Sequence, residues 1–547
     1  MQISCYQASA LLIPIHHSQS KYYFYICLIL SPRIVVVSKQ FKPRQSITME
    51  TSSNPPLLGL PSEVVERIIS GLDLASLKNL RLSCKDLSST CIGPHFKSFF
   101  KTQSTDLTKG SLEKLNAIAS HTELGGAVKH VIVQAVIYDP SELERILATK
   151  RKRITTRNGP FMSSTEPACT EEELQEAKSD LEWLHARIEE SSNQSDGSTT
   201  SMLGSAFRAF GKLDLIDLDA SVIQAPGKSV STQATREWYA IWVRATQVFT
   251  STTLAIAQSG IRVETLTFYR NTFRCSIPSV EITDHIAALK TAGFANAGVH
   301  TKNLALSIST RVVRNFSKIL EARESLQGVE RVYHEAFGGS GAGLLKPDDP
   351  EALADDNFPG VARLLQLMPN LEAFDLHLYS TLQGSVKSYD RIFNTVASEV
   401  HLPALEQCFL RGVPTTAESL LLFLEKHPKI NHLELREVRL TTGAWEPIFS
   451  HLSGMPALTK LHMSNLRSSE TGSLFNLQPI SGYDWEAFQK KRWSYPCMDG
   501  TMVHTLELGA EEIKKGLKFR PRPQERQLGS PWFMMWMEST KGLYGPP

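Results

Sequence analysis

The sequence predicts an α/β protein: a short helical unit near the N-terminus, then a helical insertion, then an irregular solenoid of strand–helix units. Three observations lead to this prediction. Two short amphipathic patterns follow each other over residues 60–87, a capped helical pattern occupies residues 170–190, and a short apolar motif recurs through the C-terminal half. Because the chain has 547 residues, we expect more than one structural unit.

The helical unit begins with LPSEVVERIISGL at residues 60–72. Pro61 suits the first helical position, and Glu63 is favourable in the first turn. The apolar residues of this helix fall on one face, at Val64, Val65, Ile68, Ile69 and Leu72. Asp73 is placed to cap a second helix, whose apolar positions are Leu74, Leu77, Leu80, Cys84 and Leu87. So small a unit gains stability by burying a face against a partner.

The middle of the chain predicts a helical insertion. Thr170 and Glu173 form a capping box, and the apolar spacing after it predicts a helix that ends near Glu190. By composition, residues 191–201 (SSNQSDGSTTS) predict a flexible linker, and residues 235–257 predict a helix with buried aromatic side chains. The basic run at 150–153 is read as solvated surface in preference to a nuclear-import patch.

The C-terminal half repeats the pattern apolar-x-x-apolar-x-apolar. Its strong copies begin at residues 371, 405, 430 and 458, which are 34, 25 and 28 apart, and weaker copies begin at 128, 263 and 503. Leucine-rich repeats are about 20–29 residues long, each a strand plus a helix, so two of the three intervals fit. The alternative is an ordinary α/β domain whose strands follow prolines. We favour stacked repeats because the strong copies are consecutive and stacking supplies each unit with a core.

Side chains alternate along a strand, so the residues between the apolar positions are expected to point outward. A ladder with both charges and one aromatic side chain suits a protein partner better than a nucleic acid or a buried small molecule. The sequence therefore predicts a target-binding surface at Asp375, His377, Phe409, Arg411, Glu434, Arg436 and His462, with Ser464 beside them.

Residues 60–87 resemble an F-box, whose pattern begins L-P-x-E and ends near L-x-L-x-x-L-R-L-x-C-K. The match runs without a gap from Leu60 to Lys85, and the one departure is Leu74, where related members often have proline. The whole chain also resembles fungal F-box proteins with an irregular leucine-rich C-terminal region. The competing interpretation is a generic helical hairpin that buries all its apolar residues internally, but Leu60, Pro61 and Leu82 lie off or at the edge of the helical stripes.

This resemblance implies an adaptor that joins a cullin through the linker subunit of an SCF-type ubiquitin ligase and recruits an unknown target protein. Residues implied in linker binding are Leu60, Pro61, Glu63, Val64, Ile68, Leu72, Leu77, Leu80 and Leu82. Two rival functions are a scaffold that binds the linker without ubiquitination and, less favoured, an enzyme in the C-terminal half.

Composition and motifs argue against other classes. Lys and Arg total 58 against 56 Asp and Glu, so no global field favours a nucleic acid. Eight cysteines without a C-x-x-C pair suggest neither a disulfide framework nor a zinc site, which indicates an intracellular protein. The glycines at 338–343 do not match G-x-G-x-x-G, and we find no H-E-x-x-H or G-x-S-x-G pattern. We therefore expect no enzyme activity, no cofactor and no metal, and a location in the cytoplasm, the nucleus or both.

The expected domain order follows from these patterns. Residues 1–48 are taken as a disordered upstream extension without a membrane partner, because the apolar run from Tyr22 to Val37 is interrupted and too short for a membrane span. The alternative is a weak membrane anchor. The helical unit is expected at 57–100, a linker with the helical insertion at 101–203, the leucine-rich domain at 204–510 and a tail at 511–547.

Overall fold

A computed structural model describes residues 11–12, 15–17, 20–22, 25–26, 60–158, 161–192, 196–230, 238–272, 275–311, 348–379, 387–468, 474–480 and 503–520. The chain divides into two compact units, Met1–Pro61 and Ser62–Pro547. The first unit contains two short antiparallel pairs: β1 (Leu11–Leu12) with β4 (Tyr25–Ile26), and β2 (Ile15–His17) with β3 (Ser20–Tyr22). The rest of the expected extension at 1–48 lies outside the described residues.

The second unit begins with four short helices: α1 (Ser62–Ile69), α2 (Leu74–Ser83), α3 (Lys85–Thr90) and α4 (Pro94–Ser98). The carboxylate of Asp73 accepts a hydrogen bond of 2.8 Å from the backbone N–H of Ser76, so the predicted cap of the second helix is confirmed. A thiol cap follows at Cys84, whose Sγ accepts from the N–H of Leu87. These caps explain why α2 ends and α3 begins within two residues.

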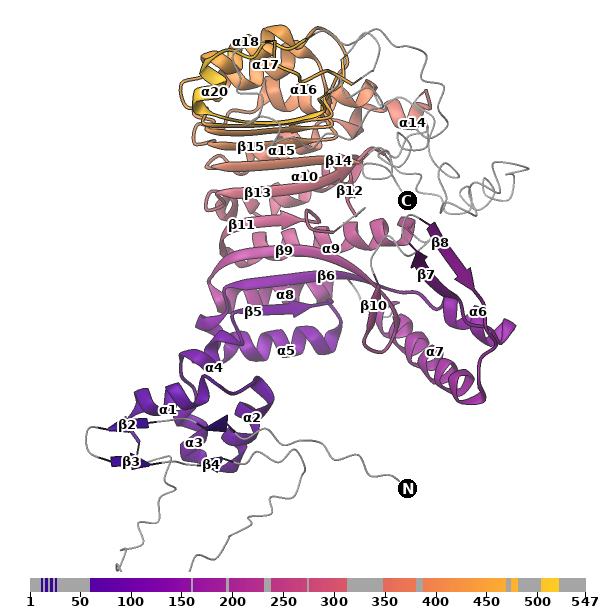
Figure 1. Ribbon diagram of the computed structural model, residues 1–547, viewed down its shortest axis with the longest axis vertical. Coiled ribbons are helices and arrows are strands. Elements are labelled where there is room, and N and C mark those ends of the chain that lie inside the picture. Colours follow the sequence, from indigo (N-terminus) through magenta and orange to yellow (C-terminus); the bar gives the residue numbers. More distant parts are fainter. Residues whose placement is uncertain are drawn as a thin grey trace, which may run out of the picture. The chain divides into compact units, whose positions relative to one another are not determined.

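The main structure is a sheet that has 12 strands in the described part of the chain. Its central strands are parallel and follow one another in chain order, apart from the antiparallel last strand (Figure 1). The strands are β5 (Thr102–Thr105), β6 (His130–Tyr138), β9 (Lys212–Ala225), β11 (Arg262–Phe268), β13 (Asn303–Ser309), β14 (Ala373–Tyr379), β15 (Gln407–Arg411), β17 (His432–Arg436), β19 (Lys460–Ser464) and β20 (Thr505–Gly509). β10 (Lys228–Val230) and β12 (Ile277–Pro278) pair at the sides of this path, and β16 (Pro414–Thr415) pairs with β18 (Arg439–Leu440) in a separate sheet.

Helices connect the strands and pack against one another along the same face of the sheet (Figure 1). Parallel neighbours require such crossover connections. The connecting helices are α5 (Lys109–Ser120), α8 (Asp196–Phe210), α9 (Trp238–Ser259), α10 (Ser279–Thr291), α11 (Phe294–Gly298), α14 (Pro350–Leu353), α15 (Gly360–Gln366), α16 (Asp390–Glu399), α17 (Ala417–Lys426) and α18 (Glu446–Gly454), with α20 (Ala510–Lys514) after the last strand. Short 3-10 turns lie at Gly125–Ala127, Asp355–Asn357 and Lys387–Tyr389.

One hydrophobic core runs between the sheet and these helices. All seven predicted apolar triplets lie in this core, and none of their side chains is more than 3% exposed. The predicted helix at 235–257 is confirmed as α9, and α17 and α18 follow the strong copies of the repeat that begin at 405 and 430. Because each strand–helix unit shares its buried face with the next, the stack forms a single core rather than several small ones.

Several strands end at a residue with left-handed backbone. The φ angles are 57° at Tyr269, 65° at Gly412, 54° at Glu437 and 51° at Asn465. The N–H of Glu437 donates to the carbonyl of Ser464 (2.8 Å), and the N–H of Asn465 donates to that of His504 (2.8 Å). These bonds extend the pairing of the strands by one residue while the chain turns away from the sheet. The left-handed backbone at this turn costs more free energy for a non-glycine residue than for glycine.

The helical insertion leaves the sheet after β6. It contains α6 (Ser141–Thr149), the hairpin of β7 (Ile154–Asn158) with β8 (Phe161–Thr165), and α7 (Glu171–Ser192). The predicted capping box is confirmed: Thr170 N–H donates to Glu173 (2.9 Å), and Glu173 N–H donates to the Thr170 hydroxyl (3.2 Å). The predicted linker at 191–201 is wrong at both ends, because Ser191 and Ser192 belong to α7 and α8 begins at Asp196. The first residues of α8 are polar and therefore resemble a linker. The helix is anchored further along by Leu203, Ala206 and Phe207, whose side chains are buried in the main core.

The sheet also differs from the expected domain boundaries. It begins at β5 and β6, well before residue 204: β5 pairs with β6, and β6 pairs with β9. The packed core also continues past residue 510, since α20 follows β20 and the side chains of Ile513 and Leu517 are buried in it. The remainder of the expected tail, residues 521–547, and the glycines at 338–343 lie outside the described residues.

Candidate functional site

The four N-terminal helices close around a small core of their own. It contains Val65 and Ile69 from α1, Leu77 from α2, and Cys91 and Phe96, and it is completed by Leu124 from the turn after α5. The i, i+4 spacing of Val65 and Ile69 places both side chains on one face of α1. The small unit is therefore stabilised by the segment that follows it in the chain.

Specific polar contacts fix the link between α1 and α4. A carboxylate oxygen of Glu66 accepts a hydrogen bond of 2.6 Å from the backbone N–H of His95, and the Nε2 of that imidazole lies 3.0 Å from the carbonyl of Leu72. A Cβ added at Gly93 would lie 1.8 Å from the Glu66 Oε2, so only glycine fits here without moving that carboxylate. The guanidinium of Arg81 lies 4.2 Å from the ring centroid of Phe96.

The residues implied in linker binding divide by exposure. The side chain of Leu82 is 84% exposed and that of Leu60 is 38% exposed. Pro61 and Glu63 are also exposed, whereas Val64, Ile68, Leu72 and Leu80 are half-buried. The helices thus leave apolar surface uncovered at this end of the chain, and exposed apolar surface of this kind is typical of a protein–protein contact site.

Leu77 does not belong to this surface. It is 0% exposed and lies in the small core, so it supports the helical unit and presents no side chain to a partner. The i, i+3 spacing of Leu74, Leu77 and Leu80 placed it on the apolar stripe, but a stripe does not show which of its members the neighbouring helices cover.

The predicted target-binding residues come together on the sheet face that the helices do not cover. Register places Asp375, Phe409, Glu434 and His462 opposite one another in one row, and His377, Arg411, Arg436 and Ser464 in the next. Adjacent strands lie about 4.8 Å apart, so each row is a continuous line of side chains. His377 and Glu434 are only 7% exposed, so these two contribute little surface; the ring of His377 packs 4.1 Å from that of Tyr379.

Alternating charges link the two rows. The Arg411 Nη2 lies 3.0 Å from the Glu434 Oε1, and the Arg436 Nε lies 2.6 Å from the same oxygen. On the other side, the Arg411 Nε lies 3.8 Å from the Asp375 Oδ1, and the second oxygen of Asp375 accepts from Arg270. We call this chain of Arg270, Asp375, Arg411, Glu434 and Arg436 the charged ladder.

Burial and charge set the pKa values along the ladder. Burial raises the pKa of the Asp375 carboxyl, and Arg270 opposes this effect. Burial, with Arg270 and Arg411 acting in the same direction, lowers the pKa of His377 to about 3, and burial and then Arg436 lower the pKa of His462. Both imidazoles are therefore neutral near pH 7, where they are hydrogen-bonding groups without charge.

Sequence reasoning missed Arg270. It lies two residues beyond Phe268, the last apolar residue of a weaker repeat, and the turn at Tyr269 carries it back over the sheet face. If the outward-facing positions had also been followed on the weaker repeat that begins at residue 263, the C-terminal end of β11, next to Arg270, would have been included in the predicted surface.

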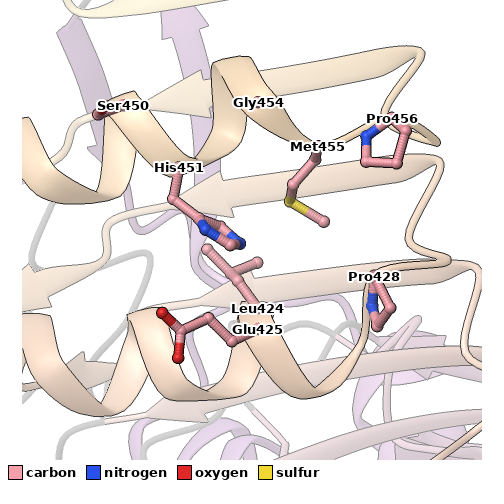
Figure 2. Close-up of a pocket in the computed structure, with 8 residues that line it drawn as sticks. All are labelled: Leu424, Glu425, Pro428, Ser450, His451, Gly454, Met455 and Pro456. Atoms are coloured by element: carbon pink, nitrogen blue, oxygen red, sulfur yellow. The ribbon is translucent and has the colours of Figure 1, made fainter.

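Other features of the described chain give weaker evidence for a functional site. Figure 2 shows a shallow groove between α17 and α18, whose lining combines apolar side chains with Glu425 and His451 and includes none of the predicted site residues. In the basic run, Lys152 pairs with Glu173 and Arg153 lies 3.2 Å from Glu166, which supports the solvated-surface interpretation. Over the described ranges, no cluster of three or more potential metal ligands occurs. No helix in the described part of the chain is both long enough and apolar enough to span a membrane.

Comparison with known proteins bears on the helical unit. A family model described as the F-box domain matches residues 57–99, which contain all four N-terminal helices. Comparison with curated proteins gives no match. An F-box implies, in general terms, an adaptor role in an SCF-type ubiquitin ligase. The helical core, the exposed apolar residues and the matched model agree over the same segment, and residues 57–99 of the chain form an F-box domain.

Proposed function

We propose that this chain is the target-recognising adaptor of an SCF-type ubiquitin ligase. Its F-box binds the linker subunit and, through it, a cullin, while the sheet face bearing the charged ladder binds a target protein. The observation that carries this proposal is the F-box match at residues 57–99 together with the 84% exposure of Leu82 within it.

The linker interface centres on Leu82, Leu60 and Pro61. Burying an exposed leucine side chain contributes about 1.5–3 kcal/mol, so its loss weakens binding by roughly 10- to 150-fold. Val64, Ile68, Leu72 and Leu80 are half-buried and add further apolar contact. Glu63 is exposed in the first turn of α1 and serves the rim of the interface.

The target interface lies on the opposite side of the strands from the helices. Arg and aromatic side chains are enriched among residues that dominate binding energy. Arg411, Arg436 and Phe409 meet this description, since the two arginines are register partners on β15 and β17 and Phe409 precedes the first of them by two residues on the same strand.

The mechanism is proximity. An adaptor holds its target near the ubiquitin-charged conjugating enzyme and so raises the effective concentration of the two reactants, while the adaptor itself does no chemistry. The chain then needs no catalytic residue and no cofactor of its own, and it acts where its ligase acts, in the cytoplasm, the nucleus or both.

Purification from native cells tests the proposal. The wild-type chain is expected to bring down linker, cullin and ubiquitylated target. Replacing Leu60 and Pro61 with alanine should remove linker and cullin yet keep the target. Replacing Arg411 and Arg436 with glutamate should remove the target yet keep the linker. A matched control is Leu353→Ala, since that leucine is 42% exposed but lies on α14, outside both surfaces.

Two outcomes would contradict the proposal. Unchanged linker recovery with the Leu60 and Pro61 variant would remove the F-box interface. Recovery of linker and target without cullin or ubiquitylated species would favour the scaffold function instead.

A further inference from the structure

The positive and the negative side chains of the charged ladder are not equally exposed to solvent. Its arginine side chains are 23%, 18% and 37% exposed at Arg270, Arg411 and Arg436. The two carboxylates are less exposed, 15% at Asp375 and 9% at Glu434. The acidic groups therefore lie deeper against the sheet, and the surface that a partner meets is dominated by guanidinium groups.

The ladder also carries a surplus of positive charge. Three arginines face two carboxylates, which leaves one positive charge. On the following strands Lys460 and Glu507 are both exposed and offset each other. His377 and His462 are neutral, as described above, so they do not change this balance. Arg436 is the most exposed member, and Glu434 is the carboxylate paired with it among the described residues.

We propose that this arginine surface binds an acidic segment of the target protein, an extended peptide whose carboxylates pair with Arg411 and Arg436. This inference rests on the proposed function and deepens it by giving the chemistry of the target. Arginine forms paired N–H···O bonds with carboxylates through its planar fork, which makes it suited to this kind of recognition.

Geometry supports an extended segment. Arg411 and Arg436 are register partners on adjacent parallel strands, so their guanidinium groups are offered side by side. Phe409 lies in the neighbouring row with its ring 4.9 Å from that of His432, and it gives an apolar side chain of the peptide a contact beside the charges. An acidic peptide with interspersed apolar residues matches both features.

A continuous polyanion fits less well. The surplus is one charge, and the carboxylates of Asp375, Glu434 and Glu507 recur along the same rows. A nucleic acid backbone would meet those carboxylates at regular intervals, whereas a peptide can place its few acidic side chains only where the arginines are. The net charge of +2 for the whole chain adds no field that would offset the mismatch.

The test uses the full chain in complex with its linker subunit and fluorescein-labelled peptides. One peptide alternates glutamate and leucine with glycine, and its partner replaces each glutamate with lysine. Binding is followed by fluorescence anisotropy at low and at high salt. We expect the glutamate peptide to bind and the lysine peptide not to bind, with affinity falling as salt screens the charges.

Variants locate the site. Arg436→Glu should weaken the glutamate peptide by about tenfold or more, and Arg436→Gln should weaken it less. Arg391→Glu is the matched control, because Arg391 is 49% exposed but lies on α16 and pairs with Asp355. Equal binding of the two peptides, or unchanged binding by both Arg436 variants in folded protein, would overturn the inference.

Failure of this inference is distinguishable from failure of the proposed function. In one outcome, the Arg411→Glu with Arg436→Glu variant loses the cellular target while the glutamate peptide neither binds the wild-type chain nor competes with the target. In that case the target does bind this surface, and only the proposed preference for acidic segments is wrong. If the same double variant keeps the target, the surface itself is wrong.

Discussion

Glu434 is the point at which the charged ladder is most vulnerable. Its Oε1 lies 3.0 Å from Arg411 and 2.6 Å from Arg436, and its side chain is only 9% exposed. Glu434→Gln keeps the shape of the side chain but leaves two arginines side by side on neighbouring strands. Like charges directly opposite each other in a sheet are destabilising.

The size of the effect follows from exposure. Removing one partner of a fully buried ion pair costs about 3–5 kcal/mol. Arg436 is 37% exposed and so keeps much of its hydration, while Arg411 keeps Asp375 at 3.8 Å. We therefore expect a smaller loss in the free energy of unfolding, about 1–3 kcal/mol.

Urea unfolding followed by circular dichroism measures this loss. A second variant, Glu434→Gln with Arg436→Gln, also removes one of the two facing arginine charges and should recover part of the stability. If Glu434→Gln is as stable as wild type at low salt, or if the double variant is no more stable than the single one, the ladder is not held by these charges and the reasoning fails.

Three further predictions concern other parts of the chain. Leu77→Ala should destabilise the F-box by about 2–5 kcal/mol through the cavity it leaves, seen as faster proteolysis within residues 60–100. Burial raises the pKa of Glu437 to about 7 from 4.5, so its contribution to stability is full below pH 4.5 and is lost as pH rises through 7. Glu437→Gln should remove that loss, on the order of 2–3 kcal/mol between pH 5 and pH 8 in urea titrations. Starting the chain at Met49 should leave the melting temperature unchanged, and a clear drop would show that residues 1–48 support the fold.

Sequence patterns predicted those parts of the fold that depend on interactions between residues close together in the chain. The caps at Asp73 and Thr170 depend on side chains within three residues, and both are present. The seven apolar triplets mark strands because one face of each strand must be buried whatever lies around it.

Sequence patterns did not predict those features that depend on packing against other segments of the chain. β13 was missed because its triplet begins with Thr301, a polar residue that is buried at 1% exposure. α8 was read as a linker, since its polar first turns resemble one until its buried residues further along are considered. The burial of His377 and the pairing of Arg270 with Asp375 depend on contacts between segments about 100 residues apart, which no periodicity encodes.

The central claim is that the F-box binds the ligase linker through exposed apolar side chains, and calorimetric titration of the purified linker subunit into the full chain tests it most directly. Leu82→Ala should weaken binding by roughly 10- to 150-fold, while Leu353→Ala should bind as wild type does, and both should keep the wild-type melting temperature. A wild-type chain that fails to bind the linker, or a Leu82→Ala variant that binds it with unchanged affinity, would contradict the account.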